Sequence, residues 1–295
     1  MNESKNEIYS FALLLDGESL AIGSKKDIKI WHLRKNKIIT RLNTTNVLAL
    51  VQLQNESLAS GSSDLNEILI WDLKTRKIIQ KLIGHWFSIN CLILDNLNGH
   101  LISGSYDCTI RIWNNCKTIQ TLIGHFDWIT CLAFISNDKL ASGSYDNTII
   151  IWDLNQNNNN NKTILVGHTD PINCILLVSN KYLASGSKDC TIRIWNILNY
   201  TMTKILTQHT GPIRSLALIS TNTFATCSND LTLKIWNLNS NKPIINELTG
   251  HDDSVSGLVF ISNKNQLISG SFDGTIRIWE VVLKNNCNLG LLNKI

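Results

Sequence analysis

The sequence is poor in several features that define other classes of protein. It has only 3 proline and 2 methionine residues in 295, so Pro-rich linkers are excluded. No apolar run approaches the roughly 18 residues needed to span a bilayer. The N-terminus, MNESKNEIYS, lacks the basic and apolar segments of a secretory signal. We therefore expect a cytoplasmic protein that does not contact a membrane. A nuclear location is left open.

Charge is also sparse. Charged residues make up 17% of the chain, below the usual ~25%. The net charge of +4 comes from Lys and Arg residues that are scattered along the whole length. Because nucleic-acid-binding proteins usually concentrate basic residues in one patch, nucleic-acid binding is not indicated.

Cysteine is present without the spacing of a metal site. None of the 8 cysteines forms a C-x-x-C pair. Without a secretory signal, we expect reduced thiols. The sequence predicts no bound metal and no cofactor.

What the chain does contain is a repeat of about 41 residues. The strings SGSYDCTIRIW, SGSYDNTIIIW, SGSKDCTIRIW, TCSNDLTLKIW and SGSFDGTIRIW end at Trp113, Trp152, Trp195, Trp236 and Trp279. Two degenerate copies, GSSDLNEILIW and IGSKKDIKIW, end at Trp71 and Trp31. Seven units are therefore predicted.

Each unit has the character of four short strands. In the fifth unit these are expected at 172–178, 182–187, 191–195 and 203–207, all rich in Ile, Leu, Val and Thr. Helical periodicity is absent throughout. A four-stranded unit that recurs in this way is one blade of a propeller, because stacking covers both of its faces.

The repeated dipeptides make the chain resemble the WD-repeat β-propeller family over residues 7–295. Gly-His opens repeats at 84–85, 124–125, 167–168 and 250–251, with Gln208-His209 as a variant, and Trp-Asp or Trp-Asn closes most of them. The resemblance implies an all-β, seven-bladed propeller of four-stranded antiparallel blades as a single domain, 1–295. The expected blades are 7–42, 46–82, 86–122, 126–166, 169–207, 210–248 and 252–294, with an Asn-rich loop insertion at 155–161.

The resemblance also implies a hydrogen-bonded tetrad of His, Ser or Thr, Asp and Trp in blades three to seven. The candidate sets are His85, Ser103, Asp107 and Trp113; His125, Ser142, Asp146 and Trp152; His168, Ser185, Asp189 and Trp195; His209, Thr226, Asp230 and Trp236; and His251, Ser269, Asp273 and Trp279. The first Ser of SGS is the preferred member, and the second Ser is left open. Since one enzyme does not need five triads, we interpret these sets as structural and expect no catalytic residues.

Blades one and two depart from the pattern. Blade one has no Gly-His, and Ile22 stands where Ser is expected. Blade two has Thr44-Thr45 in place of Gly-His. The outer strand of blade seven is expected from about 284–294, whose Asn and Gly content predicts a weak strand.

Propellers of this family most often bind partners on the face that carries the b–c and d–a loops, the loops joining the second strand to the third and the fourth strand to the next blade. The candidate partner-binding residues there are Tyr106, Trp128, Tyr145, Lys188, Arg214 and Phe272. Aromatic residues and Arg dominate the energetics of interfaces. The alternative is that these rings only pack against neighbouring loops.

The resulting functional hypothesis is a non-enzymatic scaffold or adaptor for other proteins or peptides, acting as a monomeric propeller within a complex. The alternative is a substrate receptor of a cullin-type ubiquitin ligase. No residues are left over for an F-box, and 31–34 and 71–74 only approximate a Trp-Asp-x-Arg docking feature. A reader of modified lysine would need an aromatic cage with a nearby acid.

Overall fold

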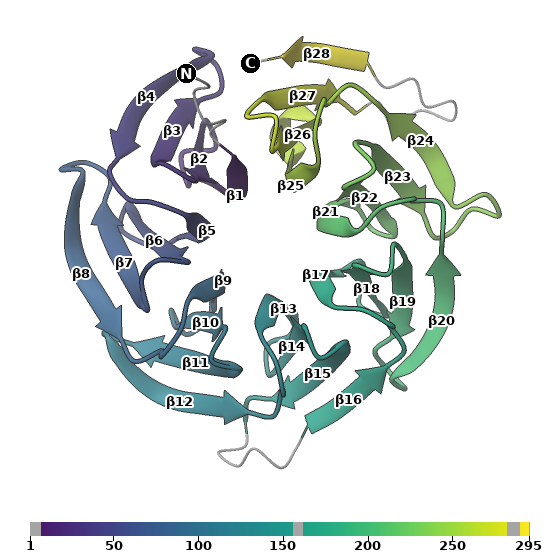
Figure 1. Ribbon diagram of the computed structural model, residues 1–295, viewed down its shortest axis with the longest axis horizontal. Helices are drawn as coiled ribbons and strands as arrows, with labels where there is room; N and C mark the ends of the chain where they lie inside the picture. The colour runs from purple at the N-terminus through teal and green to yellow at the C-terminus, as the bar shows by residue number, and fades with distance from the viewer. Residues whose placement is uncertain (1–6, 156–161, 282–289, 295) are drawn as a thin grey trace. The chain divides into compact units, whose positions relative to one another are not determined.

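The computed structural model describes residues 7–155, 162–281 and 290–294. These residues form seven four-stranded antiparallel sheets, in which the strands follow chain order (Figure 1). The one helical element among them is a 3₁₀ turn, η1 (Ser262–Lys264). The predicted all-β fold class with seven four-stranded blades is confirmed. Within these residues, no helix has the length and apolar character to cross a membrane.

The chain divides into two compact units, Tyr9–Val166 and Met1–Ile8 with Gly167–Ile295. Blades one to four consist of β1 (Ile8–Leu13), β2 (Ser19–Ser24), β3 (Ile28–His32) and β4 (Lys37–Leu42); β5 (Val47–Gln52), β6 (Ser57–Ser62), β7 (Glu67–Asp72) and β8 (Lys77–Ile83); β9 (Ile89–Leu94), β10 (Leu101–Ser105), β11 (Thr109–Asn114) and β12 (Lys117–Ile123); and β13 (Ile129–Ser136), β14 (Lys139–Ser144), β15 (Thr148–Asp153) and β16 (Lys162–Val166).

Blades five to seven follow in the other unit. They consist of β17 (Ile172–Leu177), β18 (Tyr182–Ser187), β19 (Ile192–Asn196) and β20 (Thr201–Leu206); β21 (Ile213–Ser220), β22 (Thr223–Ser228), β23 (Leu233–Asn237) and β24 (Ile244–Leu248); and β25 (Val255–Ile261), β26 (Gln266–Ser271), β27 (Ile276–Glu280) and β28 (Gly290–Lys294). β28 pairs with β27, and its expected preceding residues 284–289 lie outside the described part of the chain. Residues 156–161 of the expected Asn-rich insertion at 155–161 lie outside it as well.

Burial explains why each blade has this strand order. The second strand is almost fully buried, as in β18, whereas the fourth strand alternates or is exposed, as in β20. The tryptophan that closes the third strand pairs with the first apolar residue of the second, as Trp195 does with Leu183. Each blade is therefore most buried at its second strand and most exposed to solvent at its fourth strand.

The core lies between neighbouring blades of the same unit. Ile194 and Leu206 of blade five, for example, share one cluster with Phe224 and Trp236 of blade six. Equivalent clusters join blades one to two, two to three and three to four. Stacking buries the apolar faces that a single four-stranded sheet would leave in water.

Candidate protein-interaction surface

The polar network of blade three connects four side chains in one line. Ionised Asp107 only accepts hydrogen bonds, so His85 Nδ1, at 2.7 Å, carries the proton and donates it. His85 Nε2 then accepts from the Ser103 hydroxyl at 2.7 Å, and Ser103 Oγ accepts from Trp113 Nε1 at 2.8 Å. Every buried polar group in this line has a partner, so the network stabilises the blade.

The same network recurs in blades four to seven. The His–Asp, His–hydroxyl and Trp–hydroxyl distances there lie between 2.6 and 3.0 Å. The structure thus brings together all five sets that the repeat pattern named: those ending at Trp113, Trp152, Trp195, Trp236 and Trp279.

A fifth member was missed by the sequence reasoning. The Thr109 hydroxyl donates to Asp107 Oδ1 at 2.6 Å, and the equivalent threonine does the same in blades four to seven. The signal was present, because a threonine stands two residues after the turn aspartate in all five repeats.

The second serine of each SGS has a different role. Ser105 Oγ donates to Phe87 O at 3.0 Å and accepts from the backbone N–H of Asp107 at 3.1 Å. It therefore ties the d–a loop to the b–c turn, while the first serine, Ser103, completes the tetrad.

The aspartates of the tetrads are held ionised. Burial alone would raise the pKa of Asp107, but hydrogen bonds from His85 and Thr109 outweigh burial and lower the pKa to about 2. The pKa values of Asp146, Asp189 and Asp230 are lowered by the equivalent contacts against the same effect of burial. These carboxylates are engaged in hydrogen bonds within the tetrads and stay ionised near neutral pH, so we interpret them as structural.

The glycine that precedes four of the five tetrad histidines is explained by the crowded space around it, and Gln208 precedes the fifth, His209. A Cβ placed on Gly84 would lie 2.9 Å from an Arg111 guanidinium nitrogen and 3.0 Å from the Trp113 ring. Arg111 therefore covers the edge of the blade beside the tryptophan.

Blades one and two show what the departures from the pattern cost. Trp31 Nε1 is buried and has no hydrogen-bond partner among the described residues, because Ile22 replaces the serine. In blade two, Trp71 Nε1 donates to Ser60 Oγ at 2.8 Å. The missing histidine there is replaced by Thr45 and Asn46, which both donate to Asp64.

The cysteines in the described part of the chain are free thiols. Burial raises the pKa of Cys131 to about 12, so this thiol stays protonated. Burial, and then the nearby Cys131, also raise the pKa of the Cys91 thiol. Both side chains lie on the first strand of their blades, Cys91 on β9 and Cys131 on β13.

Three aromatic candidates meet in the loops of blades three and four. The rings of Tyr106 and Trp128 are stacked, with centroids 4.1 Å apart and planes within 6°. Tyr145 lies on Trp128 at 5.0 Å with a tilt of 43°. The stack leaves no space for a cation between Tyr106 and Trp128, so a cationic ligand would have to lie against its outer faces.

Exposed rings also lie in the d–a loops that precede blades three and four. Trp86 and Phe126, directly after the tetrad histidines, are 76% and 92% exposed, and Phe87 is also exposed. Their backbone N–H groups donate to Asp107 and Asp146, so the tetrads fix their position. In blades five to seven this position holds Thr169, Thr210 and Asp252. We call Trp86, Phe87, Tyr106, Phe126, Trp128 and Tyr145 the aromatic loop surface.

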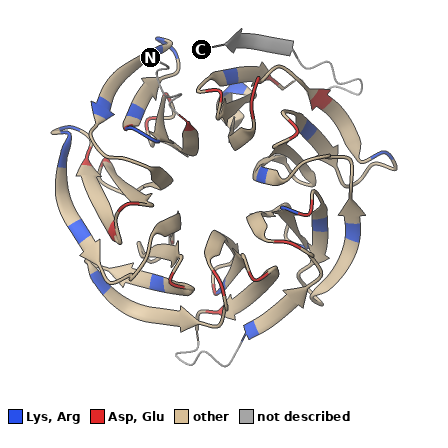
Figure 2. Ribbon diagram, in the orientation of Figure 1, with Lys and Arg blue, Asp and Glu red and all other residues tan. Residues whose placement is uncertain are grey.

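The loops that carry the aromatic loop surface contain carboxylates and no Lys or Arg of their own, while Arg111 and Lys162 reach from neighbouring strands to Gly84 and Gly124. The loops at 43–46, 63–66, 84–88, 106–108, 124–128 and 145–147 contain Asp64, Asp107, Asp127 and Asp146 and no Lys or Arg. Lys and Arg lie on outer strands such as β4, β8 and β12, on third strands such as β3 and β11, and in the β2–β3 turn of blade one (Figure 2). The pKa of Cys108 reflects this, since burial and then Asp127, Asp107 and Asp146 raise it.

The remaining candidates lie in the other unit. The Arg214 guanidinium stands over the Phe272 ring at 5.8 Å and donates to Asn229 Oδ1 at 2.7 Å. Lys188 lies in the b–c turn of blade five, where its N–H donates to Pro171 O. In blades six and seven an internal cation thus covers an aromatic ring, as the alternative of internal packing predicts for those residues.

Comparison with known families agrees with this architecture. The family described as WD domain, G-beta repeat matches residues 76–114, 116–153, 159–196, 200–237 and 242–280. These segments make up more than half of the chain, which therefore belongs to the WD-repeat family. The two degenerate units at the start lie almost entirely before the matched segments. Members of this family generally act as non-catalytic scaffolds for protein interactions.

Individual relatives match only in part. U3 snoRNP-associated protein-like EMB2271 from Arabidopsis thaliana is 33% identical over 88 residues, which are 29% of this chain and 18% of that protein. Periodic tryptophan protein 2 from the same plant is 29% identical over 83 residues, 28% of this chain and 9% of that protein. The WD repeat-containing protein 26 homolog from Arabidopsis thaliana is 30% identical over 120 residues, 38% of this chain and 20% of that protein. The chain therefore spans at most about a fifth of each of these relatives.

Proposed function

We propose that the protein is a non-enzymatic adaptor that binds a Lys- or Arg-rich segment of a partner protein on its aromatic loop surface. The observation that supports this most directly is the exposure of Trp86 and Phe126 on loops whose only charged side chains are carboxylates. Large exposed rings among the loops of a propeller are typical of an interface, because they are costly to leave in water.

The chemistry of the surface selects the partner. A guanidinium or ammonium group gains from the face of an aromatic ring and from nearby carboxylates together. The Tyr106–Trp128 stack presents such faces in a fixed position, so little side-chain entropy is lost on binding. Carboxylates would repel an acidic peptide or a nucleic acid from the same loops.

The test is an affinity purification with mass spectrometry on the wild type and on a Tyr106→Ala/Trp128→Ala/Tyr145→Ala variant, checked by circular dichroism for folding. Leu198→Ala, which removes a side chain that is 71% exposed in blade five, is the matched control. We expect a defined partner with a basic segment to be retained by the control and lost by the triple variant.

A peptide array made from that partner then tests the charge. Replacing its Lys and Arg by Gln should abolish binding, and raised salt should weaken it. A partner that binds the triple variant as well as the wild type would refute the proposal. Recovery of cullin-type ligase subunits with both proteins would favour the substrate-receptor alternative.

A further inference from the structure

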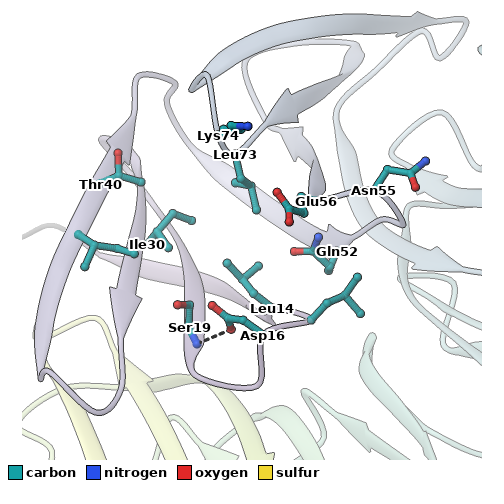
Figure 3. A pocket seen from close by; sticks show the side chains of 12 residues that line it. Leu14, Asp16, Ser19, Ile30, Thr40, Gln52, Asn55, Glu56, Leu73 and Lys74 are labelled. Atoms are coloured by element: carbon teal, nitrogen blue, oxygen red, sulfur yellow. Dashed lines mark hydrogen bonds between the residues drawn. The ribbon is translucent and has the colours of Figure 1, made fainter.

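A pocket of about 690 Å³ opens between blades one and two. It lies at the a–b and c–d turns, which are at the opposite ends of the strands from the aromatic loop surface. Leu14, Ile30 and Thr40 line it from blade one, and Gln52, Glu56 and Leu73 line it from blade two (Figure 3). None of these residues belongs to a tetrad, and the volume is within the range of ligand-binding sites, about 300–1,000 Å³.

Gln52 breaks the internal pattern of the repeats. It is the last residue of β5 and lies opposite Leu58 of β6. At the same position, opposite the first apolar residue of the second strand, blades three to seven have Leu94, Phe134, Leu177, Leu218 and Phe260. Blade two therefore places an amide where five other blades place an apolar side chain.

The orientation of this amide is fixed by its surroundings. Gln52 Nε2 donates to Leu53 O at 3.0 Å and to Ser57 O at 2.9 Å. Carbonyl oxygens only accept, so the amide nitrogen must lie on that side and Oε1 on the other. Gln52 Oε1 is buried and has no hydrogen-bond partner within the described residues, and neither has Thr40 Oγ1. A buried acceptor without a partner is costly, and a ligand that donates to it removes the cost.

The other residues that line the pocket restrict the chemical class of ligand that fits it. Leu14 and Ile30 are buried and give the pocket an apolar floor. The charged side chains of the lining are Asp16, Glu56 and Lys74, two acids against one base. Asp16 is held by the N–H groups of Glu18 and Ser19 at 2.9 and 2.7 Å, so its position is set by the turn itself.

We propose that this pocket is a second docking site, which takes the side chain of a tryptophan or tyrosine that stands beside a basic residue in a partner protein. The apolar floor requires a large apolar group, and Gln52 Oε1 requires that this group carry an N–H or O–H. No aliphatic side chain or phenylalanine combines the two. The excess of carboxylates at the rim, from Asp16 and Glu56, favours a neighbouring positive charge.

The test uses N-acetyl-Lys-Trp-Lys-amide as the probe, titrated into the isotope-labelled full chain and followed by NMR. We expect saturable shifts at residues of blades one and two. The same peptide with 1-methyltryptophan keeps the ring and removes the N–H donor, so it should bind about fivefold to tenfold more weakly. Peptides with Leu in place of Trp, or Glu in place of Lys, should also bind more weakly.

Two variants make the test specific. Gln52→Leu introduces the residue that blade three has at this position, so it should fold, and it should bind the Trp and 1-methyl-Trp peptides equally. Glu56→Gln should weaken the Lys-containing peptide alone. Glu67→Gln, whose carboxylate pairs with Lys81 on the outer strand, is the matched control and should bind as the wild type does.

Three outcomes would overturn the proposal. They are absence of saturable binding by the probe, equal affinity of the wild type for the two Trp peptides, and loss of binding in Trp128→Ala. The last would place the peptide on the aromatic loop surface instead, so this site and the proposed adaptor surface are tested separately.

Discussion

Tyr106 in blade three and Trp128 in blade four lie with their rings parallel, 4.1 Å apart between centroids. The b–c turn of one blade is thereby joined to the d–a loop of the next. The contact explains how loops without regular structure hold an aromatic surface in one conformation. It also means that each ring contributes to stability as well as to binding.

The first prediction concerns that contact. Tyr106→Ala and Trp128→Ala should each destabilise the fold, and the double variant should lose less than the sum of the two. We expect a coupling free energy of about 1 kcal/mol, typical of aromatic pairs. Urea unfolding of the four proteins measures it, and additivity within about 0.3 kcal/mol would contradict the stack.

The second prediction compares two tryptophans. Trp71→Phe removes an indole that donates to Ser60, whereas Trp31→Phe removes one whose N–H has no partner among the described residues. Both leave a similar void, so the difference isolates the hydrogen bond. Trp71→Phe should lower the free energy of unfolding by about 1 kcal/mol more than Trp31→Phe. Equal losses in chemical denaturation would show that Trp31 has a partner.

The third prediction concerns a backbone strain in blade six. Leu231 has φ of 70° and is 39% exposed, and the equivalent residue of blade seven is Gly274, with φ of 80°. A left-handed conformation costs a residue with a Cβ about 1–2 kcal/mol, which glycine does not pay. Leu231→Gly should therefore raise the free energy of unfolding by about 1 kcal/mol.

The reverse change, Gly274→Leu, is its matched control and should destabilise by a similar amount. Both are measured by the shift in the midpoint of thermal unfolding. A decrease in stability for Leu231→Gly would mean that the leucine side chain contributes packing that outweighs the strain.

The fourth prediction follows from the pKa of Asp107, which lies at about 2, below the ordinary value of 3.8 for this carboxyl. A carboxyl whose pKa is lowered in the folded state stabilises the protein above the unfolded pKa, and this is lost as pH falls through the folded value. Stability should therefore fall between about pH 4 and pH 2. Asp107→Asn should be less stable than the wild type at pH 6. Between about pH 4 and pH 2 its free energy of unfolding should fall by about 2 kcal/mol less than that of the wild type. Parallel curves for the two proteins, from urea unfolding at each pH, would contradict the assignment.

Much of the fold was predictable because the pattern repeats. In blade five the expected strands 172–178, 182–187, 191–195 and 203–207 correspond to β17–β20 within two residues at each end. The tetrads were expected because the resemblance to the WD-repeat family implies them, and the physical reason for them is that each buried tryptophan N–H needs an acceptor. Thr109 was not predicted although it recurs, because the family pattern names only His, Ser or Thr, Asp and Trp as members of the tetrad.

Other features had no sequence signal of their own. Trp86 and Phe126 follow a histidine in the sequence, and only the folded chain shows that their side chains are 76% and 92% exposed. The replacement of the blade-two histidine by Asn46 depends on a side chain reaching Asp64 across the turn. Such contacts join residues that are far apart in the chain, so no local pattern encodes them.

The sequence by itself determined the number of units, the four strands of each, and the residues that close them, because strand alternation and turn chemistry are local properties. Only the tertiary structure decided which loops of neighbouring blades meet and which polar atoms are left without a partner. Gln52 illustrates the difference. In the sequence Gln52 is an ordinary polar residue. The burial of its Oε1 beside a largely apolar pocket arises only when two blades pack together.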